Sequence, residues 1–118
     1  MTHTQRIGLF GGTFDPPHNA HVALARAALD ALQLDQLRWI PAGQPWQKLQ
    51  KTRAISAVVH REAMVRAAID GEPRFVLDRS ELERSGPSYT LDTVRALRAQ
   101  QPQAQLFLVI GADQYAGL

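Results

Sequence analysis

The stretch RIGLFGGTFDPPHNAH, residues 6–21, decides the fold. Its first part, Arg6 to Phe10, is a short apolar run that predicts a buried strand, which Gly11-Gly12 is predicted to end. From about His18 to Leu32, apolar residues recur at helical spacing and predict a helix. A strand, a glycine turn and a helix in this order are typical of the first unit of a parallel α/β sheet.

The alternation of strands and helices continues outward from this stretch. Further strands are predicted at residues 37–40, 75–82 and 106–110, and further helices at 54–69 and 90–99, with another helix beginning at Asp113. This order predicts an α/β fold, a Rossmann-like doubly wound parallel sheet with helices on both faces and right-handed crossovers. No linker divides residues 1–118, so we expect one domain. Because the chain stops as a helix begins, we expect it to be truncated.

The composition is that of a folded protein, with 45% hydrophobic and 20% charged residues. The net charge is +2, and no block of basic residues predicts binding to nucleic acid. There are no cysteines, which excludes disulfides and thiolate metal sites. No apolar run approaches the ~18 residues of a membrane span, so we expect no membrane association and a cytoplasmic location. A homo-oligomer remains open.

The turn between the first strand and the first helix is the predicted site. In open α/β sheets, ligands bind at the carboxyl ends of strands where the strand order reverses. The glycine pair permits close approach of the backbone to a ligand. His18 and His21 share one face of the helix at its N-terminus, where unpaired amides and the helix dipole favour anions. We therefore expect the two imidazoles to stabilise charge on phosphate groups.

A metal site is the alternative interpretation of the histidine pair. The pair lacks the i, i+4 spacing and the glutamate of a zinc protease helix, and no third ligand is evident nearby, so we expect no metal site formed by the protein. A Walker A motif and a G-x-G-x-x-G fingerprint are both absent from the chain.

Residues 11–21, GGTFDPPHNAH, resemble the GGTFDPxHxGH signature of the nucleotidylyltransferase superfamily, with Ala20 in place of glycine. Three later segments are similar to the nicotinate-nucleotide adenylyltransferase branch: PAGQPWQK (41–48), SYTLDT (88–93) and GAD (111–113). Trp46 and Gln47 depart from that pattern, so only Lys48 carries over from the first of them. The resemblance implies adenylyl transfer from ATP to nicotinate mononucleotide, with release of pyrophosphate, in NAD synthesis.

The resemblance also implies roles for individual residues. The implied catalytic residues are His18, His21 and Lys48. The implied ATP-binding residues are Gly11, Gly12, Thr13, Phe14, Asp15, His18, His21, Gly111 and Asp113. The implied nicotinate mononucleotide-binding residues are Thr13, Lys48, Ser88, Tyr89, Thr90 and Asp113. The implied cofactor is Mg²⁺, held mainly by the ATP phosphates.

Each of the later motifs has a simpler interpretation. Lys48 is also what a solvated loop contains, Ser88 or Thr90 is a suitable helix N-cap, and Asp113 could cap a fourth helix. The alternative functions are phosphopantetheine adenylyltransferase, which typically has Thr or Ser where His18 stands, a cytidylyltransferase, or a non-catalytic nucleotide-binding fragment. The last is open because the family's C-terminal motif for the ATP phosphates and its nicotinate-stacking aromatic residue are not in the sequence.

Overall fold

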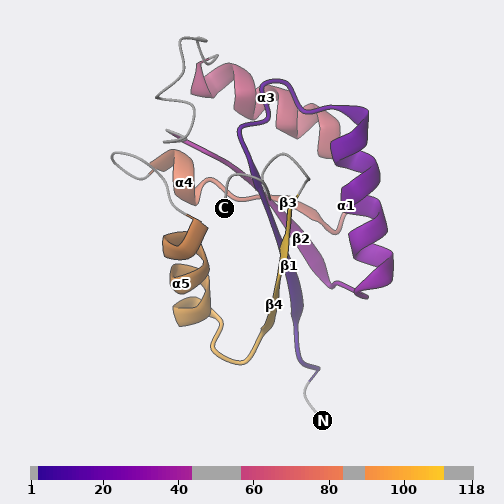
Figure 1. Ribbon diagram of the computed structural model, residues 1–118, viewed down its shortest axis with the longest axis vertical. Coiled ribbons are helices and arrows are strands. Elements are labelled where there is room, and N and C mark those ends of the chain that lie inside the picture. The colour runs from indigo at the N-terminus through magenta and orange to yellow at the C-terminus, as the bar shows by residue number, and fades with distance from the viewer. Residues whose placement is uncertain (1–2, 44–56, 84–89, 111–118) are drawn as a thin grey trace.

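The computed structural model describes residues 3–43, 57–83 and 90–110. Four strands form one parallel sheet in the order β3-β2-β1-β4 (Figure 1). The strands are β1 (Arg6–Gly12), β2 (Gln36–Pro41), β3 (Phe75–Leu77) and β4 (Gln105–Val109). The chain moves outward from β1 to β3 and then returns to the other side of β1, so the strand order reverses between β1 and β4. This is the predicted Rossmann-like, doubly wound arrangement.

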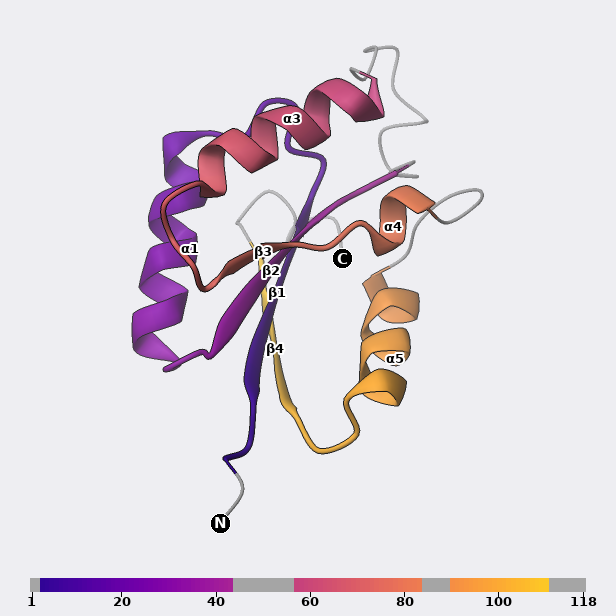
Figure 2. The same cartoon turned by 180° about the vertical axis from the view of Figure 1, so that it is seen from behind.

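Helices lie on both faces of the sheet, as predicted (Figures 1 and 2). The helices are α1 (Asn19–Ala31), α3 (Val58–Ile69), α4 (Ser80–Glu83) and α5 (Thr90–Gln100). Buried residues of α1 and α3 join one core cluster, and Leu97 of α5 joins another. The first cluster holds the large aromatic side chains, whereas the second is aliphatic.

Alternate residues of the strands supply the two clusters, as the pleat of a strand requires. In β1, Phe10 faces the aromatic cluster, while Ile7 and Leu9 face the aliphatic one. Gly8 lies on the aromatic side, where an added Cβ would come within 2.4 Å of the Leu37 side chain and 2.6 Å of that of Leu34. The glycine therefore lets leucines pack directly on the strand backbone.

Two predicted strand ends are wrong. β1 continues through Gly11 and Gly12, which are in register with Ile40 and Pro41 of β2. Glycine weakens a strand but leaves its backbone able to pair, and here pairing to β2 outweighs its turn preference. At the other strand, β3 ends at Leu77 and does not reach residue 82.

The chain leaves β3 because a side chain competes with the sheet for the backbone. The carboxylate of Asp78 accepts the N–H of Ser80 at 2.9 Å, and the short helix α4 begins there. An aspartate that bonds an amide two residues onward favours a turn or a helix start over an extended strand.

Two helix predictions also need correction. Ala57 is extended, with a ψ of 148°, so α3 begins at Val58 and not at residue 54. In α5, Val94 and Leu97 pack on the core, but Leu91 is 57% exposed. Six helical residues turn through about 600°, which places Leu97 roughly 120° from Leu91 around the helix. The three leucine and valine positions therefore do not all face the sheet.

Candidate functional site

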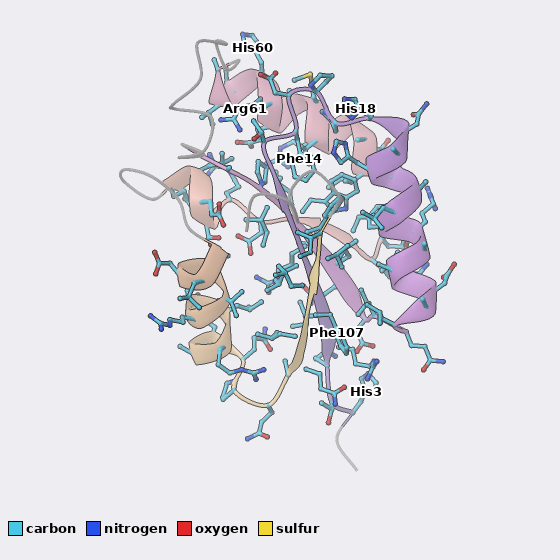
Figure 3. All side chains as sticks on the ribbon, viewed as in Figure 1. His3, Phe14, His18, His60, Arg61 and Phe107 are labelled. Atoms are coloured by element: carbon cyan, nitrogen blue, oxygen red, sulfur yellow. The ribbon has the colours of Figure 1, made fainter. Side chains whose placement is uncertain are left out.

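The predicted site lies at the carboxyl end of β1, beside the point where the strand order reverses. Residues 13–18 connect this strand end to α1, and the side chains of Phe14, His18 and Arg61 gather there (Figure 3). Ligands of doubly wound sheets bind in this crevice, because the helix N-termini and the connecting loops meet there.

The two histidines form one unit at the start of α1. His18 is the extended N-cap residue, and its backbone N–H donates to Nδ1 of His21 at 2.8 Å. The two imidazole rings stack with their centroids 4.7 Å apart and their planes 11° from parallel. The predicted shared face is confirmed. Because Nδ1 accepts a hydrogen bond, a neutral His21 carries its proton on Nε2 and can act as a donor from that atom.

The His21 ring is oriented by the core below it. It packs against Phe14, with centroids 5.2 Å apart, and against Phe10 at 5.9 Å. His21 is half-buried as a result, whereas His18 lies exposed on top of it. Donors held in place before a ligand arrives stabilise developing charge better than donors that must first be ordered.

Phe14 is the strained residue of the turn. Its φ is +52°, in the left-handed region, yet its side chain is only 3% exposed. It makes edge contacts with Phe10 at 5.4 Å and lies 5.3 Å from Trp39. Such a backbone conformation costs about 1–3 kcal/mol, and the burial of the ring offsets that cost. With its side chain in the core, Phe14 can meet a nucleotide only through its backbone.

Arg61 is a residue of this region that the sequence analysis missed. Its side chain is 1% exposed and reaches from α3 beneath the turn. Nη1 donates to the carbonyl oxygens of Thr13 at 3.1 Å and Ala42 at 2.5 Å, and Nη2 donates to that of Gly43 at 3.3 Å. Burial lowers the pKa of Arg61, and the carboxylate of Asp15 opposes that change. The one sequence signal is that Arg61 precedes the buried Val65 by four residues, on the same helix face.

A second buried polar contact lies between α4 and α5. Thr93 donates its hydroxyl to Glu81 at 2.6 Å, and both side chains are buried. The carbonyl of Glu81 also approaches Gly43 so closely that an added Cβ there would lie 2.3 Å from it. The end of β2 and the helices α4 and α5 are therefore packed together without room for a larger residue at position 43.

The structure brings together part of the predicted site. Gly11 and Gly12 end β1, and Thr13, Asp15, His18 and His21 follow on the connection to α1. Thr90 is the first residue of α5. The other predicted residues lie outside the described part of the chain: Lys48, Ser88, Tyr89, Gly111 and Asp113.

A hollow of about 450 Å³ lies against α1 and α3, away from the strand ends. Its walls are the first turns of α1, from Pro17 to Arg26, and Ala68 of α3. His18 is the only predicted site residue that lines it. The hollow therefore touches the site from behind the helix and does not cross the edge of the sheet.

Across residues 3–43, 57–83 and 90–110, no three His, Cys, Asp or Glu side chains gather in a way that would hold a metal ion. Within the same ranges, no helix is both long and apolar enough to span a membrane.

A four-stranded parallel sheet with its order reversed beside a histidine-bearing helix N-terminus defines a doubly wound α/β protein. Comparison with protein families narrows this class. The chain belongs to the cytidylyltransferase-like family, whose model matches residues 9–118.

Two curated relatives are more than half identical to this chain. The protein of Methylibium petroleiphilum is 56% identical over 114 residues, which cover 97% of this chain and 52% of that protein. The protein of Albidiferax ferrireducens is 53% identical, covering 97% of this chain and 56% of that protein. Both are named "probable nicotinate-nucleotide adenylyltransferase". The chain thus spans about half the length of the curated relatives it matches.

Solved structures confirm the fold. The nicotinic acid mononucleotide adenylyltransferase of Plasmodium falciparum, complexed with APC, superposes with a TM-score of 0.72 at 17% identity. That match covers 96% of this chain and 54% of the other. The structure of the same enzyme complexed with NaAD gives a TM-score of 0.69 at 16% identity and covers 55% of that chain.

Proposed function

We propose that this chain forms the N-terminal part of a nicotinate-nucleotide adenylyltransferase. In the proposed reaction, a phosphate oxygen of nicotinate mononucleotide attacks the α-phosphorus of ATP, and the bond from that phosphorus to the β-phosphate bridging oxygen breaks. The products are nicotinate adenine dinucleotide and pyrophosphate. The observation that carries the proposal is the stacked His18–His21 pair at the end of β1, in a chain 56% identical to a relative of that name.

The geometry of the turn suits transfer without a covalent intermediate. Phosphoryl-type transfer depends mainly on positioning and on stabilising charge. His21 is held by aromatic packing and by the His18 amide, so its Nε2–H is a preoriented donor for a phosphate oxygen. The N-terminus of α1 adds its dipole and unpaired amides to the same place. The glycines at the end of β1 leave the backbone open to the nucleotide.

The other residues complete the proposal from the resemblance. Lys48 would neutralise phosphate charge, Gly111 and Asp113 would bind ATP, and Ser88, Tyr89 and Thr90 would bind nicotinate mononucleotide. Mg²⁺ would arrive as part of the MgATP substrate, held by the phosphates. The donor set of the described turn, imidazole and backbone amide, suits phosphate oxygens better than a Mg²⁺ ion, which prefers oxygen ligands. The proposal includes a cytoplasmic location and allows a homo-oligomer.

Position 18 separates this function from its near rival. Phosphopantetheine adenylyltransferases typically have Thr or Ser at that position, and this chain has a histidine that stacks on His21.

The test is a turnover assay of two proteins. One is the 118-residue chain, and the other is a chimera that continues it with the residues following the matched segment of the M. petroleiphilum relative. Each receives MgATP or MgCTP with nicotinate mononucleotide or phosphopantetheine. We expect the chimera to form nicotinate adenine dinucleotide and pyrophosphate in equal amounts from ATP, and the short chain to be much slower. Positioning needs contacts on both sides of the reacting phosphorus, and the relatives are about twice as long.

Product from CTP or phosphopantetheine alone would refute the proposed substrates. A chimera that binds ATP but turns nothing over would support a non-catalytic nucleotide-binding module.

A further inference from the structure

The buried guanidinium of Arg61 joins the connections that leave two neighbouring strands. Thr13 follows β1, and Ala42 and Gly43 follow β2. The same side chain donates to the carbonyls of all three residues. Because β1 and β2 are adjacent in the sheet, the arginine ties together two walls of the same carboxyl edge.

A cation at this place is not explained by burial of apolar surface. Taking a charged group out of water is costly, and an apolar residue of similar volume in such a position is often neutral or stabilising. Three carbonyl oxygens satisfy the guanidinium, and each is a neutral backbone group. What an apolar side chain cannot supply is the set of directional bonds that holds these carbonyls at fixed separations.

The turn held by Arg61 is also the one that carries the histidine pair. Thr13 is followed at once by Phe14, whose left-handed φ is held by the packing of its ring. The turn is therefore fixed from two directions, by a side chain from α3 and by its own aromatic anchor. His18 stands at the far end of that connection, and Figure 3 shows it at the same end of the molecule as Phe14 and Arg61.

We propose that Arg61 is a positioning residue, which holds the turn after β1 against the end of β2 and so sets where His18 and His21 meet the nucleotide phosphates. The part of this statement that concerns phosphates rests on the proposed function. The part that concerns the turn rests on the hydrogen bonds of Arg61 alone.

The geometry predicts how substitutions should rank. In R61K, a single ammonium nitrogen can approach the shared position of Nη1 between Thr13 and Ala42, but it cannot also reach Gly43 as Nη2 does. In R61M, the volume remains and every donor is lost. The matched control is R66M in the same helix, because Arg66 is exposed and pairs with Glu62 at 2.9 Å.

The experiment measures ATP affinity and amide hydrogen exchange in the 118-residue chain. We expect R61M to raise the ATP dissociation constant by about tenfold or more, the scale of one lost hydrogen bond to a charged group, with R61K between it and wild type. We expect R66M to bind as wild type does. Exchange should accelerate at the amides of His21 and Ala42, which bond to the turn and to the end of β1, but not at Gln101 behind α5.

A purely structural arginine would give a different pattern. If R61K and R61M are less stable and exchange faster throughout, while the folded protein keeps the wild-type ATP dissociation constant, the positioning role is refuted. Should the wild-type chain itself fail to bind ATP, the proposed function fails for this chain, and exchange still decides the role of Arg61. Faster exchange confined to His21 and Ala42 would support the clamp, and unchanged exchange there would overturn it.

Discussion

The two ends of the sheet both carry histidine and arginine, but they use them differently. At the amino end, His3 bonds to the carboxylate of Asp35 at 2.9 Å, and Asp35 also accepts the backbone N–H of Arg6 at 2.7 Å. The Arg6 guanidinium in turn bonds to Gln105 at 2.6 Å and lies 4.7 Å from the centre of the Phe107 ring. Polar side chains at this end are therefore paired largely with one another across the chain.

At the carboxyl end, the arginine is buried and bonds to backbone carbonyls, and the histidines stack at a helix N-terminus. Figure 3 shows His18, Phe14 and Arg61 at this end and His3 at the other. Side chains that pair with one another mainly join segments of the chain. Side chains that shape the backbone around exposed donors prepare a place for a ligand. The predictions below contrast the two ends, beginning with the largest effect.

Replacing Phe14 with alanine should have the largest effect on stability. We expect a loss of about 3–5 kcal/mol, the usual cost of removing a buried phenylalanine side chain. The matched change at the amino end, Phe107→Ala, should cost clearly less, because Phe107 is only partly buried. Urea unfolding at equal m-values measures both. Equal losses at the two positions would show that the aromatic anchor of the turn is no more important than a peripheral ring.

Replacing His18 with alanine should lower the turnover of the chimera described above. We expect kcat to fall by about 10²–10³-fold, the scale for loss of one donor that stabilises developing charge. His3→Ala at the opposite end should leave kcat unchanged, because His3 bonds to Asp35 and lies far from the turn. Near wild-type turnover of the His18 variant, or the same loss in the His3 variant, would contradict the assignment.

Replacing Asp35 with asparagine should produce the smallest effect, and one that depends on pH. The backbone N–H of Arg6, and then His3, hold the pKa of Asp35 below its usual value of 3.8. A lowered carboxyl pKa stabilises the fold above the usual value, and that stabilisation is lost as the pH falls through the folded-state pKa. We therefore expect Asp35→Asn to lower Tm at pH 7 and to differ less from wild type at pH 3.

The control for this change is Asp30→Asn, at an exposed position of α1, which also removes one negative charge. A difference between Asp35→Asn and wild type that is the same at both pH values would show that the charge of Asp35 does not bind the amino end together.

Local sequence patterns determined the frame of this protein and the first part of its site. The alternation of apolar strands and periodic helices predicted the doubly wound sheet, because these periods depend only on backbone geometry. The spacing of His18 and His21 predicted their shared face for the same reason. Gly71, with a φ of +93°, ends α3 close to where the sequence predicted.

Only the tertiary structure showed how the turn is held. Arg61 lies 48 residues from Thr13, and no local period marks an arginine as buried. The hydrogen bond from Thr93 to Glu81 and the left-handed conformation of Phe14 are equally invisible to spacing. Each depends on which elements the folded sheet brings together. A buried cation or a strained residue is stable only where distant parts of the chain supply its carbonyls or its aromatic neighbours.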